Sequence, residues 1–354
     1  MEAEEIQLKK PVYLIKAHLR EHLKQYSRLD SLPISYDDLL HFSESLPHVD
    51  AAGNNTLWFT VIYDRSYSDE IHGGLVRIYE KLINEGGIVP YLKIERVDFC
   101  TFGNSKPFRI MVTNEINDNY DYFYIKRADA SRIYGLELEE IFSPDKVNYI
   151  VDGQTLVEEH VIGIPVDEFI LKHDGVKIEN RMRFAKEFVK FNERCFVRLL
   201  GDMRAYNFVV EVTQDFDNIQ YRLRAMDFDQ QCYEGKMNMY KPQFYKDNLA
   251  LVTLVTEMMS KPMADQYQKE ERVAMKKRFL TSRQRTRSLI RKMNRDRLSS
   301  PEKINELKTA LAAYHKQPGF MNLNKMGDVL NLHLECSLDI NVISKPLKNE
   351  GGGV

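Results

Sequence analysis

The feature that most constrains the fold is a change of residue pattern near residue 163. Between residues 89 and 158, short runs rich in β-branched and aromatic residues alternate with turn-forming pairs such as Gly-Asn, Asn-Asp and Asp-Gly. After residue 165 the spacing of apolar residues becomes mostly helical. A meandering antiparallel sheet followed by helices predicts an α+β protein with two lobes. The predicted strands are 91–100, 108–113, 120–126, 147–151 and 155–161.

The same patterns divide the chain into four parts. Residues 1–88 are expected to form an N-terminal α/β extension, with helical spacing in 10–48, a strand at 56–63 and a helix at 69–85. Residues 89–163 form the sheet-rich lobe, residues 164–345 the helical lobe, and residues 346–354 a flexible tail. One helix, 129–142, interrupts the sheet-rich lobe, with Asp129 or Ser131 as its N-cap. In the helical lobe we expect helices at 166–172, 180–200, 245–259, 266–294, 300–315 and 327–334, and a hairpin of 207–212 with 221–226.

Composition excludes several classes of protein. With 354 residues, 43% hydrophobic and 29% charged, the chain is long enough for a proper core and too polar for a membrane bundle. The net charge of −2 gives no overall field that would gather nucleic acid or anionic lipid. The four cysteines lie far apart without a CxxC pair, which argues against a zinc site and leaves disulfides unsupported. The longest apolar stretch, 249–259, is far shorter than the ~20 residues that span a bilayer, so we expect a cytoplasmic protein.

Two short stretches carry residue types suited to chemistry. Residues 201–207, Gly-Asp-Met-Arg-Ala-Tyr-Asn, follow a long amphipathic helix and precede a strand, while residues 226–229, Met-Asp-Phe-Asp, end the partner strand. Magnesium prefers oxygen donors and usually takes one or two carboxylates plus phosphate oxygens and water. Asn207 and Asp227 can supply that minimum. Asp202 lies five residues before Asn207, so its carboxylate can orient a substrate hydroxyl or accept its proton.

These stretches resemble the protein-kinase-like superfamily, in particular its branch of aminoglycoside and choline phosphotransferases. The family's catalytic loop reads Asp-x4-Asn and a later Asp-Phe segment follows, which Asp202, Asn207 and Asp227 match. Upstream, Lys126 ends a predicted strand just before a helix, as the family's phosphate-binding lysine does. Residues 156–165 are similar to the hinge between the family's lobes. The resemblance covers about residues 90–260 and leaves both ends of the chain outside it.

The resemblance implies a bilobal protein-kinase-like fold that uses ATP and Mg²⁺. It implies that Lys126 holds the α- and β-phosphates, and that hinge backbone groups such as those of Glu159 and Val161 bind adenine. It further implies that Asn207 and Asp227 hold the metal and that Asp202 orients the attacking hydroxyl.

A carboxylate on the helix after Lys126 should pair with that lysine. Glu137, Glu139 and Glu140 all remain open for this role, and distance along the chain favours Glu140. The implied reaction moves the γ-phosphoryl group of the nucleotide to a hydroxyl-bearing acceptor, a small molecule in preference to a protein.

The chain also departs from the family pattern. Leu200 stands two residues before Asp202, where the family has a histidine, and Asp227 follows Asp202 by 25 residues, which is longer than usual. The stretch 100–105 offers only Gly103 in place of a glycine-rich phosphate loop. A catalytically inactive kinase-like binding module is therefore one alternative. A nucleotidyl transferase that moves AMP on the same fold is another.

A basic segment, residues 276–297, carries ten cations and one acid. It could grip a phosphate backbone, but Phe279 is its only aromatic residue, so a stacking platform for single strands is missing. A solvated helix face is the favoured interpretation, and nucleic-acid binding is not expected. The residues expected to face inward are Leu280, Leu289, Ile290 and Met293.

Overall fold

The computed structural model describes residues 10–49, 53, 55–101, 103–173, 178–215 and 218–342. The expected flexible tail, 346–354, lies outside the described residues. The chain divides into two compact units. Unit 1 comprises residues 1–140, 144–164 and 224–231, and unit 2 comprises residues 141–143, 165–223 and 232–354.

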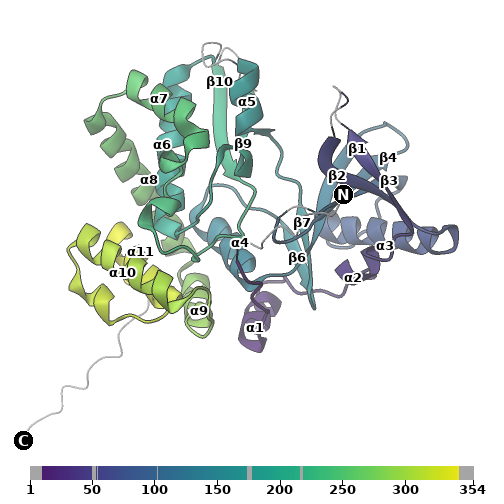
Figure 1. Cartoon of the computed structure of the whole chain (residues 1–354), viewed down its shortest axis with the longest axis horizontal. Coiled ribbons are helices and arrows are strands. Elements are labelled where there is room, and N and C mark those ends of the chain that lie inside the picture. Colours follow the sequence, from purple (N-terminus) through teal and green to yellow (C-terminus); the bar gives the residue numbers. More distant parts are fainter. Residues whose placement is uncertain are drawn as a thin grey trace, which may run out of the picture. The chain divides into compact units, whose positions relative to one another are not determined.

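Unit 1 contains a seven-stranded sheet in the order β1-β2-β3-β4-β5-β7-β6, in which each strand runs antiparallel to its neighbours (Figure 1). This confirms the antiparallel sheet of the predicted α+β class. The sheet begins well before residue 89, so the expected N-terminal extension contributes two strands to it. The strands are β1 (Glu44–Val49), β2 (Asn55–Ile62), β3 (Leu92–Cys100), β4 (Phe108–Asn114), β5 (Tyr120–Arg127), β6 (Tyr149–Asp152) and β7 (Thr155–Glu159).

The edge strand β1 contradicts the helical spacing predicted over 10–48, which is therefore wrong for its last residues. Its residues are exposed or half-buried throughout, so they show no alternation of apolar and polar side chains. Pro47 within it cannot donate a backbone hydrogen bond, which is tolerated at the edge of a sheet.

One face of the sheet carries the apolar core of unit 1. Phe123 and Ile125 of β5 belong to a single buried cluster with Ile71, Leu75 and Ile78 of α3 (Arg65–Asn84). The helix lies along the sheet in Figure 1. Because side chains alternate across a strand, this burial directs the intervening side chains of β5 to the opposite face. The other helices of unit 1 are α1 (Ala17–Gln25), α2 (Tyr36–Leu39) and α4 (Ala130–Phe142), the last of which ends in unit 2.

Unit 2 is mostly helical, as predicted for the C-terminal part of the chain. Its central helix α6 (Arg181–Arg198) is buried along most of its second half and packs against α7 and α8. A small sheet has the order β10-β9-β8, formed by β8 (Ile164–Pro165), β9 (Phe208–Asp215) and β10 (Asn218–Ala225). The other helices are α5 (Val166–His173), α7 (Leu249–Met258), α8 (Lys261–Thr281), α9 (Arg283–Met293), α10 (Pro301–His315) and α11 (Met326–Leu338). Short 3₁₀ helices are η1 (Ala205–Asn207), η2 (Met237–Tyr240), η3 (Pro242–Phe244), η4 (Lys246–Asn248) and η5 (Pro318–Asn322).

The predicted single helix over 266–294 is wrong, because the helix breaks at Ser282 between α8 and α9. The carbonyl of Ser282 accepts hydrogen bonds from both the N–H (2.9 Å) and the hydroxyl (3.0 Å) of Thr286. The N–H bond is the regular first bond of α9, and the hydroxyl bond to the same carbonyl is the kind of side-chain contact that bends helices.

The basic segment lies on these two helices. Leu289, Ile290 and Met293 are buried as predicted, but Leu280 is 57% exposed, contrary to the prediction. Among the described residues, we find no helix that combines the length and the apolar character needed to cross a bilayer.

Candidate functional site

Lys126 lies near the end of β5, on the sheet face opposite the apolar core. Its side chain is buried, and its Nζ donates a hydrogen bond of 2.6 Å to Oε2 of Glu158 on the neighbouring strand β7. Glu158 is directly opposite Tyr124 in the β5–β7 register, so it shares a face with Lys126, two residues further along β5. The carboxylate that pairs with Lys126 therefore comes from the sheet.

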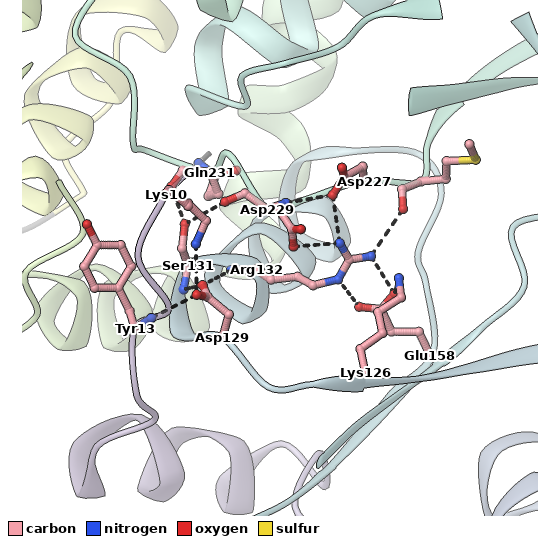
Figure 2. Close-up of polar contacts among 11 residues, drawn as sticks. Lys10, Tyr13, Lys126, Asp129, Ser131, Arg132, Glu158, Asp227, Asp229 and Gln231 are labelled. Atoms are coloured by element: carbon pink, nitrogen blue, oxygen red, sulfur yellow. Dashed lines mark hydrogen bonds and ion pairs between the residues drawn. The ribbon is translucent and has the colours of Figure 1, made fainter. Parts of the chain in front are cut away.

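Arg132, one turn into α4, joins this ion pair to the segment after β10. Its guanidinium is buried and binds both carboxylate oxygens of Glu158, Oε2 at 2.7 Å. Its Nη1 donates to Oδ1 of Asp227 at 2.8 Å and to Oδ1 of Asp229 at 2.9 Å, and its Nη2 donates to the Met226 carbonyl at 3.3 Å. Figure 2 shows the guanidinium between the two groups of acceptors. We call Lys126, Arg132, Glu158, Asp227 and Asp229 the unit 1 cluster.

The two aspartates of the cluster differ in their surroundings. The N–H of Asp229 donates to Oδ1 of Asp227 at 2.9 Å, which fixes the turn of this segment. The side chain of Asp227 is 32% exposed, compared with 11% for Asp229. Within the described part of the chain, Oδ2 of Asp227 accepts no hydrogen bond. One carboxylate oxygen of Asp227 is thus open to a ligand.

The start of α4 is fixed by a second set of contacts. Asp129 caps the helix, because its Oδ1 accepts the N–H of Ser131 at 2.8 Å, and this confirms Asp129 as N-cap. Its Oδ2 binds the N–H of Tyr13 and the ammonium of Lys10, each at 2.9 Å. The hydroxyl of Ser131 donates to the Gln231 carbonyl at 2.7 Å. These contacts, also drawn in Figure 2, tie the N-terminal segment and the segment after Asp229 to the beginning of α4.

The electrostatics of the cluster follow from two cations facing three carboxylates. Burial alone would raise the pKa of Glu158, but Arg132 and Lys126 lower it to about 2. Burial, followed by the charge of Arg132, lowers the pKa of Lys126. Burial and the neighbouring Asp229 raise the pKa of Asp227. The cluster therefore carries an excess of carboxylate groups, which favours a further cation beside Asp227.

In unit 2, Asp202 and Asn207 come together in one loop, residues 201–207, which we call the unit 2 loop. Asp202 has a left-handed backbone (φ 56°), and its carbonyl accepts the Asn207 Nδ2 at 2.6 Å. Its Oδ1 accepts the Nε of Arg204 at 3.0 Å, and its N–H donates to the Tyr245 hydroxyl at 2.9 Å. Arg204 also donates to Asp247 at 3.0 Å. Within the described residues, Oδ1 of Asn207 accepts no hydrogen bond, so it is open as an oxygen ligand.

Glu140, expected to pair with Lys126, pairs with Arg28 instead. It lies eight residues after Arg132, which is about 12 Å further along the helix axis. The alternative Glu137 binds His22 at 2.8 Å and the Tyr149 hydroxyl at 2.6 Å. The expected helix carboxylate is therefore replaced by Glu158.

Glu159 and Val161, the two residues predicted to bind adenine, differ in their backbone bonding. The N–H of Glu159 already donates to the Asn148 carbonyl at 2.9 Å, and its carboxylate accepts the Asn148 side chain at 2.8 Å. Val161 follows the end of β7 and is buried, and its backbone makes no hydrogen bond with the described residues. Of the two, Val161 has the backbone groups that remain open to a ligand.

The unbonded Oδ2 of Asp227 is a carboxylate oxygen of the type that Mg²⁺ prefers. No group of three or more histidine, cysteine, aspartate or glutamate side chains able to hold a metal occurs within the described ranges. A cation beside Asp227 would thus need phosphate oxygens and water to complete its shell, which is how Mg²⁺ is usually bound with nucleotides.

Sequence reasoning missed Arg132 and assigned no role to Glu158 or Asp229. The alternation of side chains along β5 and β7 is the signal that could have placed Glu158 on the face of Lys126.

In comparisons with known proteins, no protein-family model and no curated protein matches the chain.

Proposed function

We propose that the chain is an ATP- and Mg²⁺-dependent phosphotransferase that moves the γ-phosphoryl group to a hydroxyl of a small molecule. The observation that carries this proposal is the meeting of Lys126 and Asp227, 101 residues apart in sequence, in the single unit 1 cluster. A buried lysine, linked through Glu158 and Arg132 to a carboxylate with one open oxygen, offers one group for the phosphates and one for the metal of a metal-bound triphosphate. The proposal includes a bilobal protein-kinase-like fold with the nucleotide-binding lobe in the sheet-rich part.

We assign a separate role in the reaction to each of these residues. Lys126 binds the α- and β-phosphates, and the backbone of Val161 binds the base. Asp227 and Asn207 each offer an open oxygen to the metal. Bound Mg²⁺ would neutralise charge on the phosphates. Asp202 orients the acceptor hydroxyl and takes its proton while the phosphorus–oxygen bond to the acceptor forms and the bond to ADP breaks.

The test is transfer by the purified full chain, with choline and an aminoglycoside as acceptors, followed by phosphorus NMR with and without Mg²⁺. We expect ATP to be consumed at a Mg²⁺-dependent rate. In Asp227→Ala this rate should fall at least about 10²-fold. Asp265→Ala, an exposed aspartate of α8, is the matched control and should behave as wild type. Identical traces for wild type and Asp227→Ala would refute the proposal. Release of pyrophosphate instead of ADP would identify AMP transfer.

A second candidate, a module that binds nucleotide without transfer, is favoured by one observation. Arg132 already neutralises Oδ1 of Asp227, and Arg204 already holds the carboxylate of Asp202. A metal and an acceptor hydroxyl would have to compete with these cations. Stabilisation of the fold by Mg²⁺–ATP in a thermal shift, with no turnover over hours, would favour this candidate over the enzyme.

A further inference from the structure

All three nitrogen atoms of the Arg132 guanidinium donate hydrogen bonds. Nε and Nη2 bind Glu158 on β7, while Nη1 binds Asp227 and Asp229 in the segment after β10. The side chain is only 2% exposed, so water does not compete for these bonds. Lys126 is joined to Asp227 through Glu158 and this single guanidinium.

We propose that Arg132 is a positioning residue that holds Lys126 and Asp227 at a fixed separation for a metal-bound nucleotide. The inference rests on the proposed function and deepens it, because it names the group that organises the site. Arg132 does not itself touch the nucleotide.

The backbone around Arg132 is held in place on both sides. Asp129 caps the helix one turn earlier, and Ser131 binds the carbonyl of Gln231. Further along α4, a Cβ added to Gly135 would lie 2.9 Å from Cβ of Phe228, so the helix lies closely against the segment that carries both aspartates. The position of the guanidinium is therefore set by backbone packing.

An arginine is the suitable residue for this position. Its planar fork binds the Glu158 carboxylate through two nitrogens while its third nitrogen remains directed at Asp227. A lysine ammonium is a compact charge and cannot span both acceptors in this geometry. Without the guanidinium, Lys126 would be the only cation among three buried or half-buried carboxylates, and Asp227 would lose its fixed orientation.

The experiment measures Mg²⁺ affinity by calorimetry on the full chain saturated with a nonhydrolysable ATP analogue. In Arg132→Lys we expect Mg²⁺ to bind about tenfold more weakly, as for other groups that orient metal ligands. The matched control is Arg194→Lys in unit 2. Arg194 is equally buried and binds Glu187 at 2.8 Å and the Leu223 carbonyl at 3.1 Å. This control should leave Mg²⁺ affinity unchanged.

The outcomes separate this inference from the proposed function. Wild-type Mg²⁺ affinity in a folded Arg132→Lys protein would overturn the inference while leaving the phosphotransferase intact. Equal losses in Arg132→Lys and Arg194→Lys would show a general effect of stability and would also overturn it. Failure of the wild type to bind Mg²⁺ with the analogue would overturn the proposed function. Should Arg132→Lys not fold, Glu158→Asp, which keeps the charge but shortens the bridge, must show the weaker Mg²⁺ binding.

Discussion

The unit 1 cluster and the unit 2 loop hold candidate site residues in different ways. In the cluster, every ion pair joins residues at least 26 positions apart in sequence, and the partners are largely buried. In the loop, Asp202 bonds to two neighbours within five residues, Arg204 and Asn207, as well as to the more distant Tyr245. Arg204 is 38% exposed, so solvent screens this pair.

The geometry of each group of residues has a different origin. The cluster depends on the fold of unit 1, because strand register and the start of α4 must both be correct before the charges meet. The loop depends on local backbone geometry, with Asp202 in the left-handed region and a short 3₁₀ turn after it. Substitutions in the cluster should therefore affect stability and function together, while substitutions in the loop should affect function alone.

The largest effect should follow from Asp202→Asn in the loop. We expect turnover to fall about 10³-fold, because the acceptor hydroxyl loses its proton acceptor, while nucleotide affinity stays within about twofold. The measurement is kcat alongside the dissociation constant of ATP. Asp247→Asn is the control, since Asp247 binds the same Arg204 but is not assigned a role in the reaction. Equal activity of both variants would remove Asp202 from the mechanism.

The next largest effect should be the loss of stability in Glu158→Gln. This change leaves Lys126 and Arg132 buried without their shared carboxylate, and we expect a cost of about 3 kcal/mol. Denaturant unfolding can be followed by the fluorescence of Trp58, the chain's single tryptophan, which lies in β2 of unit 1. Glu168→Gln, which breaks an exposed pair with Lys172, should cost less than about 0.5 kcal/mol. Similar costs for the two changes would contradict the distinction between a buried cluster and exposed pairs.

Acid should destabilise unit 2 before it reaches the cluster of unit 1. His333 is buried in unit 2, and its Nδ1 lies 2.8 Å from Nε2 of His315. Burial lowers the pKa of His333 from 6.5 to about 3 and that of His315 from 6.5 to about 4. The unfolded chain then binds protons that folded unit 2 excludes, so stability present above pH 6.5 is lost as the pH falls toward 4. The stability due to Glu158 is instead lost only between pH 4.5 and about 2.

We expect unit 2 to lose about 3 kcal/mol between neutral pH and pH 4, because the buried His333 stays neutral from pH 6.5 down to pH 4 and one pKa unit corresponds to about 1.4 kcal/mol. Thermal unfolding followed by far-UV circular dichroism reports mainly the helices of unit 2, and Trp58 fluorescence reports unit 1. The dichroism transition should move to lower temperature first. In His333→Gln this early shift should shrink, and an unchanged shift would assign the acid sensitivity to other groups.

The smallest effect should follow from Glu140→Gln. Glu140 pairs with the partly exposed Arg28 and lies away from Lys126, so turnover should change by less than about twofold. A steady-state assay measures the turnover of Glu140→Gln and of Glu158→Gln under the same conditions. A larger loss in Glu140→Gln than in Glu158→Gln would show that Lys126 uses the helix carboxylate during the reaction.

Much of the fold was predictable because the signals are local. The alternation around Phe123 and Ile125 marks β5 as a strand with one buried face. The Asp129 cap marks the start of α4, and the glycine pair after α3 marks its end. The loop from Asp202 to Asn207 lies within one short stretch, so its convergence also follows from sequence.

The partners within the cluster could not be predicted in the same way. Glu158 meets Lys126 because of the register between β5 and β7, and Arg132 reaches Asp227 because of the direction in which α4 leaves Asp129. The strand register and the direction of α4 are both set by packing across unit 1. The periodicity of residues along the chain carries no information about that packing. Distance along the chain favoured Glu140 for Lys126 and gave no weight to an arginine on the same helix.

The most direct test of the central claim is a crystal structure of the full chain with Mg²⁺ and a nonhydrolysable ATP analogue. We expect that Lys126 contacts the phosphates, that the metal lies on the open oxygen of Asp227, and that Arg132 still bridges Glu158 and Asp227. Nucleotide bound away from Lys126, or a metal bound without Asp227, would contradict that claim.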